Sequence, residues 1–215
     1  MRVTEMLRMN CSQIWSRMIR HPFVLELYEG TLPAEKFRYY VLQDYSYLSG
    51  LMRCMCVIAS KSDAELMREV LHMTHDEATS ELESYKRTIA SVGLSMDEAL
   101  KTEPAPTNLA YMNFILTTAY TKSPVEGLTA ILPCFWGYAD IAETNKALLE
   151  DNRNEVYKAW ASVYLERSTK DLVEELRCIV DSLDDHESAS RIFMTASRYE
   201  CMFWDMAYKQ ERWIV

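Results

Sequence analysis

The chain has 215 residues, 49% of them hydrophobic, and a formal net charge of −9 at pH 7. This acidic excess argues against a nucleic-acid backbone as a partner, since phosphate binding needs clustered Lys and Arg. No run of roughly eighteen apolar residues occurs. The longest apolar stretch, 128–142, is interrupted by Pro133 and Asp140, so we expect no membrane span. With only five Gly and six Pro and little strand-like alternation, the composition favours an all-α protein.

The N-terminal segment and the cysteines are typical of a cytoplasmic protein. Segment 1–15 is amphipathic, carries Glu5 early and lacks the apolar core of a signal peptide. The six cysteines form no CxxC pair and are not densely spaced, so we expect reduced thiols and neither a disulfide framework nor a zinc ribbon. They are Cys11, Cys54, Cys56, Cys134, Cys178 and Cys201.

Helix start and stop signals divide the chain into segments joined by short connections. Pro22 and Gly30 bound a short helix, and Gly93 ends a long one. The short connections favour antiparallel packing of neighbouring helices. Without an internal repeat or linker, we predict a single domain over 1–215. The expected helices are 4–20, 23–29, 33–60, 62–92, 95–101, 108–121, 123–150, 154–166, 168–181 and 185–212.

The helix predicted over 123–150 is interrupted by residues that disfavour a regular helix. Ser123 and Glu126 form a capping box at its start. Pro133, deep inside the pattern, removes a backbone hydrogen bond and is expected to kink the helix. Cys134 lies between this proline and Gly137. The thiol is either a buried small apolar group beside a packing kink or a reactive cysteine.

Two carboxylates stand where a helix should be apolar. Asp44 shares a predicted helix face with aromatic residues, and Glu200 lies in an otherwise apolar stripe of the last helix. Burying an unpaired charge is costly, so each could belong to a buried ion pair or a helix cap. Since two such acids occur on different helices, together with Cys134, we interpret them as parts of one pocket.

An alternative metal site is suggested by four residues on one predicted helix, His72, His75, Asp76 and Glu77. His72 and His75 are three residues apart on one predicted helix, a spacing that helical di-iron sites use. Such sites need further Glu and His ligands, whereas His21 and His186 lie near helix ends. We therefore expect a solvated or capped pair and no metal. A Cys–His hydrolase pair is also poorly supported, because no histidine has a setting like that of Cys134.

Several motifs together carry a family resemblance. They are HPF (21–23), YYVLQDYSYL (39–48), LPCFWGY (132–138), the tyrosine of WASVY (160–164) and YECMFWDMAY (199–208). In this order, over nearly the whole chain, the sequence resembles TenA-type thiaminase II proteins, the aminopyrimidine aminohydrolases, in their cysteine-containing branch. The resemblance implies a helical bundle of the haem-oxygenase-like type, a homotetramer and no cofactor.

The resemblance also implies a role for each matching residue. Cys134 falls on the nucleophile of the family and Glu200 on its acid/base glutamate. The expected substrate-binding residues are Asp44, Tyr47, Tyr111, Tyr138, Tyr164 and Phe203.

The implied reaction is hydrolysis in thiamin-pyrimidine salvage. It converts 4-amino-5-aminomethyl-2-methylpyrimidine, and more weakly thiamin, into the 5-hydroxymethyl pyrimidine through a covalent thiol adduct. Two other functions stay open at this stage. The chain could be a metal-dependent oxidase of the same fold, which would use His72 and His75, or a non-catalytic pyrimidine carrier or regulator, which would tolerate loss of Cys134.

Overall fold

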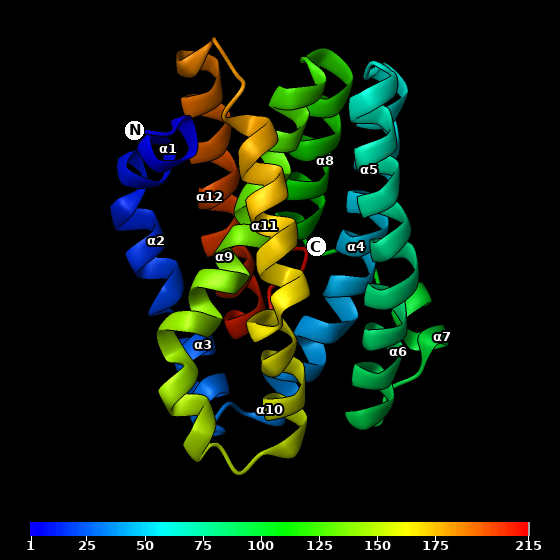
Figure 1. Cartoon of the computed structure of the whole chain (residues 1–215). Helices are drawn as coiled ribbons and strands as arrows, with labels where there is room; N and C mark the ends of the chain where they lie inside the picture. The colour runs from blue at the N-terminus through cyan, green and yellow to red at the C-terminus, as the bar shows by residue number, and fades with distance from the viewer. Residues whose placement is uncertain (215) are drawn as a thin grey trace.

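Helix packs on helix throughout the computed structural model, which describes residues 1–214 (Figure 1). These residues contain no strand, as the all-α prediction requires. In chain order the elements are α1 (Val3–Asn10), α2 (Ser12–Ile19), α3 (Pro22–Glu29), α4 (Ala34–Lys61), α5 (Ala64–Asp76), the π-helical turn η1 (Glu77–Glu81), α6 (Leu82–Ser91), α7 (Met96–Lys101), α8 (Pro106–Thr121), α9 (Pro124–Asp151), α10 (Glu155–Ser162), the 3-10 turn η2 (Val163–Leu165), α11 (Arg167–Val180) and α12 (His186–Lys209).

The long helices α4, α8, α9 and α12 pack against one another and hold most of the core. Aromatic side chains fill its centre. Trp204 stacks on Phe23 with ring centroids 5.2 Å apart and on Tyr40 at 5.5 Å. All three are almost completely buried, so their apolar area contributes strongly to stability. Within residues 1–214, no helix combines the length and the apolar character that crossing a membrane requires.

The local signals explain most helix boundaries. Ser123 and Glu126 form the expected capping box of α9, and Pro124 occupies its first turn. Gly30 ends α3 with φ 80°, and Gly93 adopts φ 70° just after α6, in the left-handed region that favours glycine. α9 continues through Pro133 as one helix from Pro124 to Asp151.

The single helix predicted over 4–20 is wrong, because the chain turns at Cys11 between α1 and α2. Cys11 has φ −101° and ψ 12°, and its N–H donates to the carbonyls of Leu7 and Arg8. The turn lets α1 contact α11 and α12 while α2 packs on α9 and α12. The sequence around this turn contains no proline or glycine. Tertiary packing, and not local propensity, therefore imposes the turn.

Two further boundaries differ from the prediction. The helix expected over 62–92 contains η1, a single π-helical turn. The last helix ends at Lys209 and not near 212, because Gln210 turns into the left-handed region with φ 52°. The Glu211 carboxylate then accepts hydrogen bonds from the backbone N–H and hydroxyl of Thr107, at 2.9 and 3.1 Å, and so caps the start of α8.

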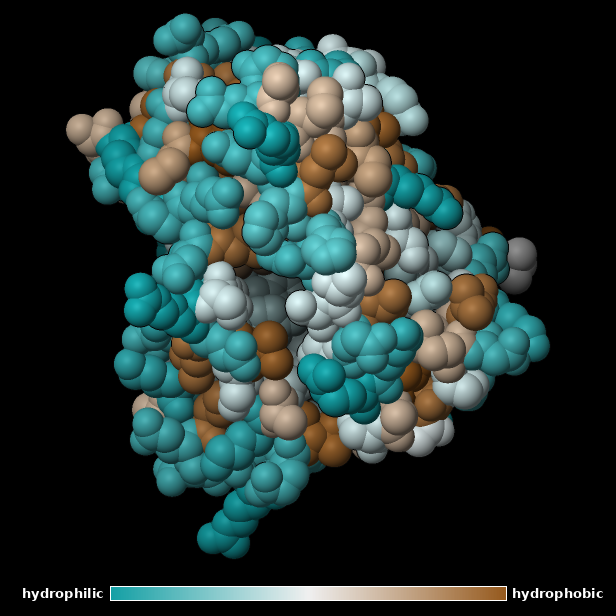
Figure 2. Space-filling view, turned by 45° about the vertical axis from the view of Figure 1, so that its right-hand side comes forward, coloured by the Kyte–Doolittle hydropathy of each residue, from teal (hydrophilic) through white to brown (hydrophobic). Residues whose placement is uncertain are grey.

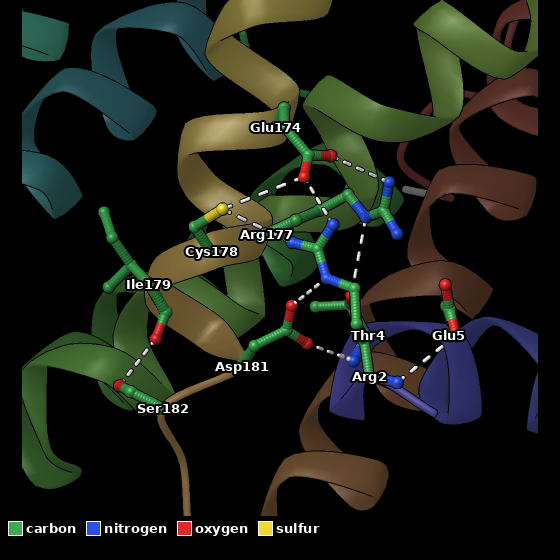
Figure 3. Close-up of polar contacts among 9 residues, drawn as sticks. All are labelled: Arg2, Thr4, Glu5, Glu174, Arg177, Cys178, Ile179, Asp181 and Ser182. Atoms are coloured by element: carbon green, nitrogen blue, oxygen red, sulfur yellow. Dashed lines mark hydrogen bonds and ion pairs between the residues drawn. The ribbon is translucent and has the colours of Figure 1, made fainter.

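The N-terminal residues brace α11 (Figure 3). The Arg2 guanidinium pairs with Glu174 on α11 and with Asp181, which directly follows α11. The backbone N–H of Thr4 donates to Asp181 at 2.8 Å, and Arg177 pairs with Glu174 at 3.0 Å. These contacts connect the first and penultimate helices of the chain, which lie far apart in sequence.

The capping box of α9 also ties α9 to α12, which gives a first testable expectation. Glu126 accepts from the N–H and hydroxyl of Ser123, and from the hydroxyl of Ser188 on α12 at 2.5 Å. We expect Glu126→Ala to lower the free energy of unfolding by about 1–3 kcal/mol, measured by urea denaturation. Glu98→Ala, in the matching box of α7 that lacks a third bond, should lower it less. Equal losses would show that the Ser188 contact adds nothing.

Candidate active site

A cavity of about 570 Å³ opens between α4, α5, η1, α9, η2 and α11. It appears as the recess in the face shown in Figure 2, where hydrophilic residues surround much of the opening. Its size lies in the range typical of small-molecule sites. Of the residues predicted to form a site, five line it: Asp44, Tyr47, Cys134, Tyr138 and Tyr164.

Cys134 reaches the cavity from the middle of α9, directly after Pro133. The residue is half-buried. Burial, followed by the negative charge of Glu200, raises the thiol pKa well above its ordinary value. The nearby Tyr47 hydroxyl has the opposite effect: it favours the thiolate and so lowers the thiol pKa. At rest the sulfur is therefore a protonated thiol and needs a base before it can act as a nucleophile.

Glu200 lies on α12. Although it is far from Cys134 in sequence, its negative charge acts on the Cys134 thiol. The residue is only 2% exposed, and its carboxylate accepts a hydrogen bond of 2.6 Å from the Tyr111 hydroxyl on α8. Burial raises the pKa of Glu200 to about 7, while the Tyr111 hydrogen bond opposes the rise. A carboxyl group that titrates near neutral pH can both donate and accept a proton there.

Asp44 lines the cavity from α4, three residues before Tyr47. Burial raises the pKa of Asp44 well above its ordinary value, and the negative charges of Glu81 and Glu200 raise it further. The nearby Tyr40 hydroxyl opposes the rise. That hydroxyl also lies 3.0 Å from the Tyr138 hydroxyl. The empty cavity thus favours a protonated Asp44, and a ligand group that donates a hydrogen bond would favour its ionised form.

Aromatic rings form the walls of this end of the cavity. Tyr138 and Tyr164 pack together with ring centroids 4.9 Å apart. Behind the lining, Tyr111 and Phe203 pack against Tyr47 at 5.0 and 5.5 Å. The structure therefore brings all eight predicted site residues together, with Tyr111, Phe203 and Glu200 forming the layer behind the lining residues.

Two acids that were not expected as substrate-binding residues also line the cavity, Glu77 and Glu81, which we call the acidic pair. Both belong to η1. Burial, then the charges of Glu81 and Asp44, raise the pKa of Glu77 to about 8. A signal did exist, since both continue the apolar series of α5 and α6 at helical spacing: Leu66, Val70, Met73, Glu77, Glu81, Tyr85 and Ile89.

His72 and His75 do not form a metal centre with the residues around them. Both are exposed, and His72 pairs with Asp76 at 3.2 Å on the same helix. Over positions 1–214, no group of three or more His, Cys, Asp or Glu side chains is arranged to hold a metal ion.

The fold has known counterparts. The chain superimposes with a TM-score of 0.77 on a domain of unknown function from Shewanella denitrificans that has a heme oxygenase-like fold, at 17% identity and over 98% of this chain and 93% of the other. This likeness concerns the fold alone, and it confirms the predicted haem-oxygenase-like helical class.

The family is established by the sequence. The model of the TENA/THI-4/PQQC family matches residues 8–210, so the chain belongs to that family, as the motifs predicted. A structure of a TenA homologue from P. horikoshii is 46% identical with a TM-score of 0.95, over 97% of this chain and 99% of that one.

Curated relatives carry the name aminopyrimidine aminohydrolase. The protein from Halalkalibacterium halodurans is 31% identical over 93% of this chain and 92% of its own length. The protein of the same name from Helicobacter pylori is 29% identical over 97% of this chain and 100% of its own.

The raised pKa of Glu200 makes the stability of the protein depend on pH. Between the ordinary carboxyl pKa of 4.5 and the folded value of about 7, the unfolded chain releases its proton first. The buried acid therefore lowers stability as pH rises through this window, by up to about 3 kcal/mol. Glu200→Gln should lack this loss when urea unfolding at pH 5 and pH 8 is compared. Glu187→Gln, exposed on the same helix, should behave as wild type. An unchanged pH difference in Glu200→Gln would contradict the assignment.

Proposed function

We propose that this protein is an aminopyrimidine aminohydrolase of thiamin-pyrimidine salvage. It would hydrolyse 4-amino-5-aminomethyl-2-methylpyrimidine to the 5-hydroxymethyl pyrimidine and ammonia, with thiamin as a weaker substrate. The observation that carries the proposal is one thiol, Cys134, lining an aromatic-walled cavity, with the carboxyl group of Glu200, of near-neutral pKa, behind the lining and acting on that thiol by its charge. The names of the relatives support the same activity.

In the proposed reaction the Cys134 sulfur adds to a carbon of the pyrimidine ring, and its proton moves to the nearby Glu200 carboxylate. Glu200 passes a proton to a ring nitrogen, which makes the ring an electron sink. The ring electrons then expel the amine, which in its ammonium form leaves the 5-methylene as neutral ammonia. Water adds to the methylene carbon and gives up a proton to Glu200. The carbon–sulfur bond breaks, the sulfur takes this proton from Glu200, and the ring nitrogen releases its proton to solvent, which restores the aromatic ring and the free thiol.

Asp44 is proposed to recognise the exocyclic 4-amino group. That group donates hydrogen bonds, and an ionised carboxylate accepts them. Because burial favours the protonated acid in the empty cavity, the bound amino group supplies the interaction that stabilises the charged form. Tyr138 and Tyr164 offer ring faces against which a flat heteroaromatic ring can stack.

The assembly and the location of the protein belong to the same proposal. The family resemblance implies a homotetramer, and α8 and α12 expose the apolar side chains of Tyr120 and Met202 that an oligomer could bury. We also propose a single domain over 1–215 and a cytoplasmic location.

Release of ammonia from the aminomethyl pyrimidine is the direct test. We expect wild type to release one ammonia per hydroxymethyl pyrimidine formed, followed by coupled enzyme assay and chromatography. Cys134→Ser should lose most turnover, because an alcohol is a far weaker nucleophile than a thiolate. Cys56→Ser, at an exposed cysteine, should keep it. Wild-type turnover in Cys134→Ser would refute the covalent route, and pyrimidine binding without turnover in wild type would favour a carrier.

Loss of the Glu200 proton should slow the reaction without abolishing binding. Glu200→Gln preserves shape and can still accept the hydrogen bond from Tyr111. We expect kcat to fall about 10²–10⁴-fold, the usual size of a general acid–base contribution, while the Kd of the product changes little. In wild type the pH–rate profile should show a limb near pH 7 that the variant lacks. A near-normal kcat would leave Glu200 as a buried structural acid.

A further inference from the structure

The cavity is larger than one pyrimidine ring requires. Its volume of about 570 Å³ is in the range of sites for drug-sized ligands, whereas the proposed substrate is a single substituted ring. The residues proposed to act on the ring gather on α4, α9 and α12. The rest of the lining comes mainly from α5, η1, α6 and α11. A second part of the ligand, carried on the 5-methylene, can occupy the space beside these elements.

The lining of this outer space is acidic. Among residues 1–214, the charged groups that line the cavity include one guanidinium, that of Arg87. The carboxylates that line it are Asp44, Asp76, Glu77, Glu81, Glu166, Asp171 and Glu175. A cavity lined by one sign of charge concentrates ligands of the opposite sign and excludes those of the same sign.

The acidic pair is the part of this lining that faces the ring site. Neither Glu77 nor Glu81 forms a hydrogen bond or ion pair with another side chain in the described range, and both are half-buried. Burial raises the pKa of both groups, the charge of Glu81 adds to the rise for Glu77, and Arg87 only partly offsets the rise for Glu81. Such an arrangement is unfavourable in the empty protein, and a cation placed between the acids would relieve it.

The local fold explains why both acids point inward. A π-helical turn inserts one extra residue and rotates the side chains that follow, and such turns are frequent at functional sites. η1 therefore keeps both Glu77 and Glu81 on the cavity side while Tyr85 returns to the core. Independently of these acids, Tyr47 lines the same cavity, is only 4% exposed, and its hydroxyl has no hydrogen-bond partner among residues 1–214. An orphaned buried hydroxyl points to a missing ligand.

We propose that Glu77 and Glu81 form a subsite for a positively charged substituent on the 5-methylene of the pyrimidine, and that they select substrates by charge. This inference rests on the proposed function and adds the selection of the leaving group. An ammonium group and a larger cationic heterocycle share the chemistry that two carboxylates recognise. A phosphate ester at the same position is repelled.

Binding of ligands that differ only in charge tests the subsite. The ligands are the 5-aminomethyl pyrimidine (cation), the 5-hydroxymethyl pyrimidine (neutral) and its phosphate ester (anion), with thiamin as the larger cation. Calorimetry in a Cys134→Ala background keeps the ligands intact. Adding Glu77→Gln and Glu81→Gln together should weaken binding of the aminomethyl pyrimidine by about tenfold or more. The alcohol should change by less than about twofold, and the phosphate ester should bind more tightly.

A matched control separates the subsite from general charge effects. Glu83→Gln removes an acid from α6 that is exposed and paired with Lys86, and it should leave all Kd values unchanged. If circular dichroism shows that the double variant does not fold, Glu81→Gln alone replaces it in the test. It should change the Kd values in the same direction but by a smaller factor. Weakening of both the ammonium ligand and thiamin extends the subsite to large cations, whereas weakening of the ammonium ligand alone confines it to small ones.

The outcomes that overturn the inference differ from those that overturn the function. Equal shifts for the cationic, neutral and anionic ligands, or no shift at all, would remove the subsite while leaving the hydrolase intact. Failure of the protein with wild-type Glu77 and Glu81 to bind any of these pyrimidines would instead refute the proposed function.

Discussion

The site depends on one physical constraint: Cys134, Asp44 and Glu200 are removed from water, and none of them forms an ion pair with a cationic side chain among residues 1–214. Glu200 keeps a single strong partner, the Tyr111 hydroxyl at 2.6 Å, and is 2% exposed. Desolvation therefore raises the pKa of Glu200 toward neutrality, and the charges around the cavity raise those of Asp44 and Cys134 as well. The same environment that makes Glu200 a suitable proton carrier keeps the thiol protonated until a base accepts its proton.

The fold holds these groups in place by tying together the helices that carry them. Glu126 connects the start of α9, the helix of Cys134, to the start of α12, the helix of Glu200. Glu211, beyond the end of α12, caps α8, the helix that carries Tyr111. Arg2 holds α11, which lines the cavity with Asp171 and Glu175 among other residues. Polar contacts at the ends of the helices thus support a site that lies at their centres, where backbone bonds are already satisfied.

Fold and chemistry carry different information about this protein. The heme oxygenase-like arrangement persists in a domain that is only 17% identical, so the arrangement of helices does not specify a reaction. The reaction we propose depends on which side chains the helices bring to the cavity. One end of the cavity is defined by the Cys134 thiol, next to Pro133, and by Glu200, which is bonded to Tyr111. The other end is defined by the acidic pair on η1. The two ends suit a ligand with a flat ring and a charged substituent.

The sequence by itself determined the all-α class and most helix boundaries, and it singled out residues that the structure brings together around one cavity. Asp44 and Glu200 were visible because a carboxylate in an apolar stripe violates helical periodicity, and Cys134 because it lies between Pro133 and Gly137. The structure alone decided that Glu200 pairs with Tyr111 on another helix, since periodicity reports which face of a helix is buried but not which partner covers it. It also decided the turn at Cys11 and the π-turn η1, neither of which has a local signal. Both form because tertiary packing outweighs the weak preference of a few residues for a regular helix.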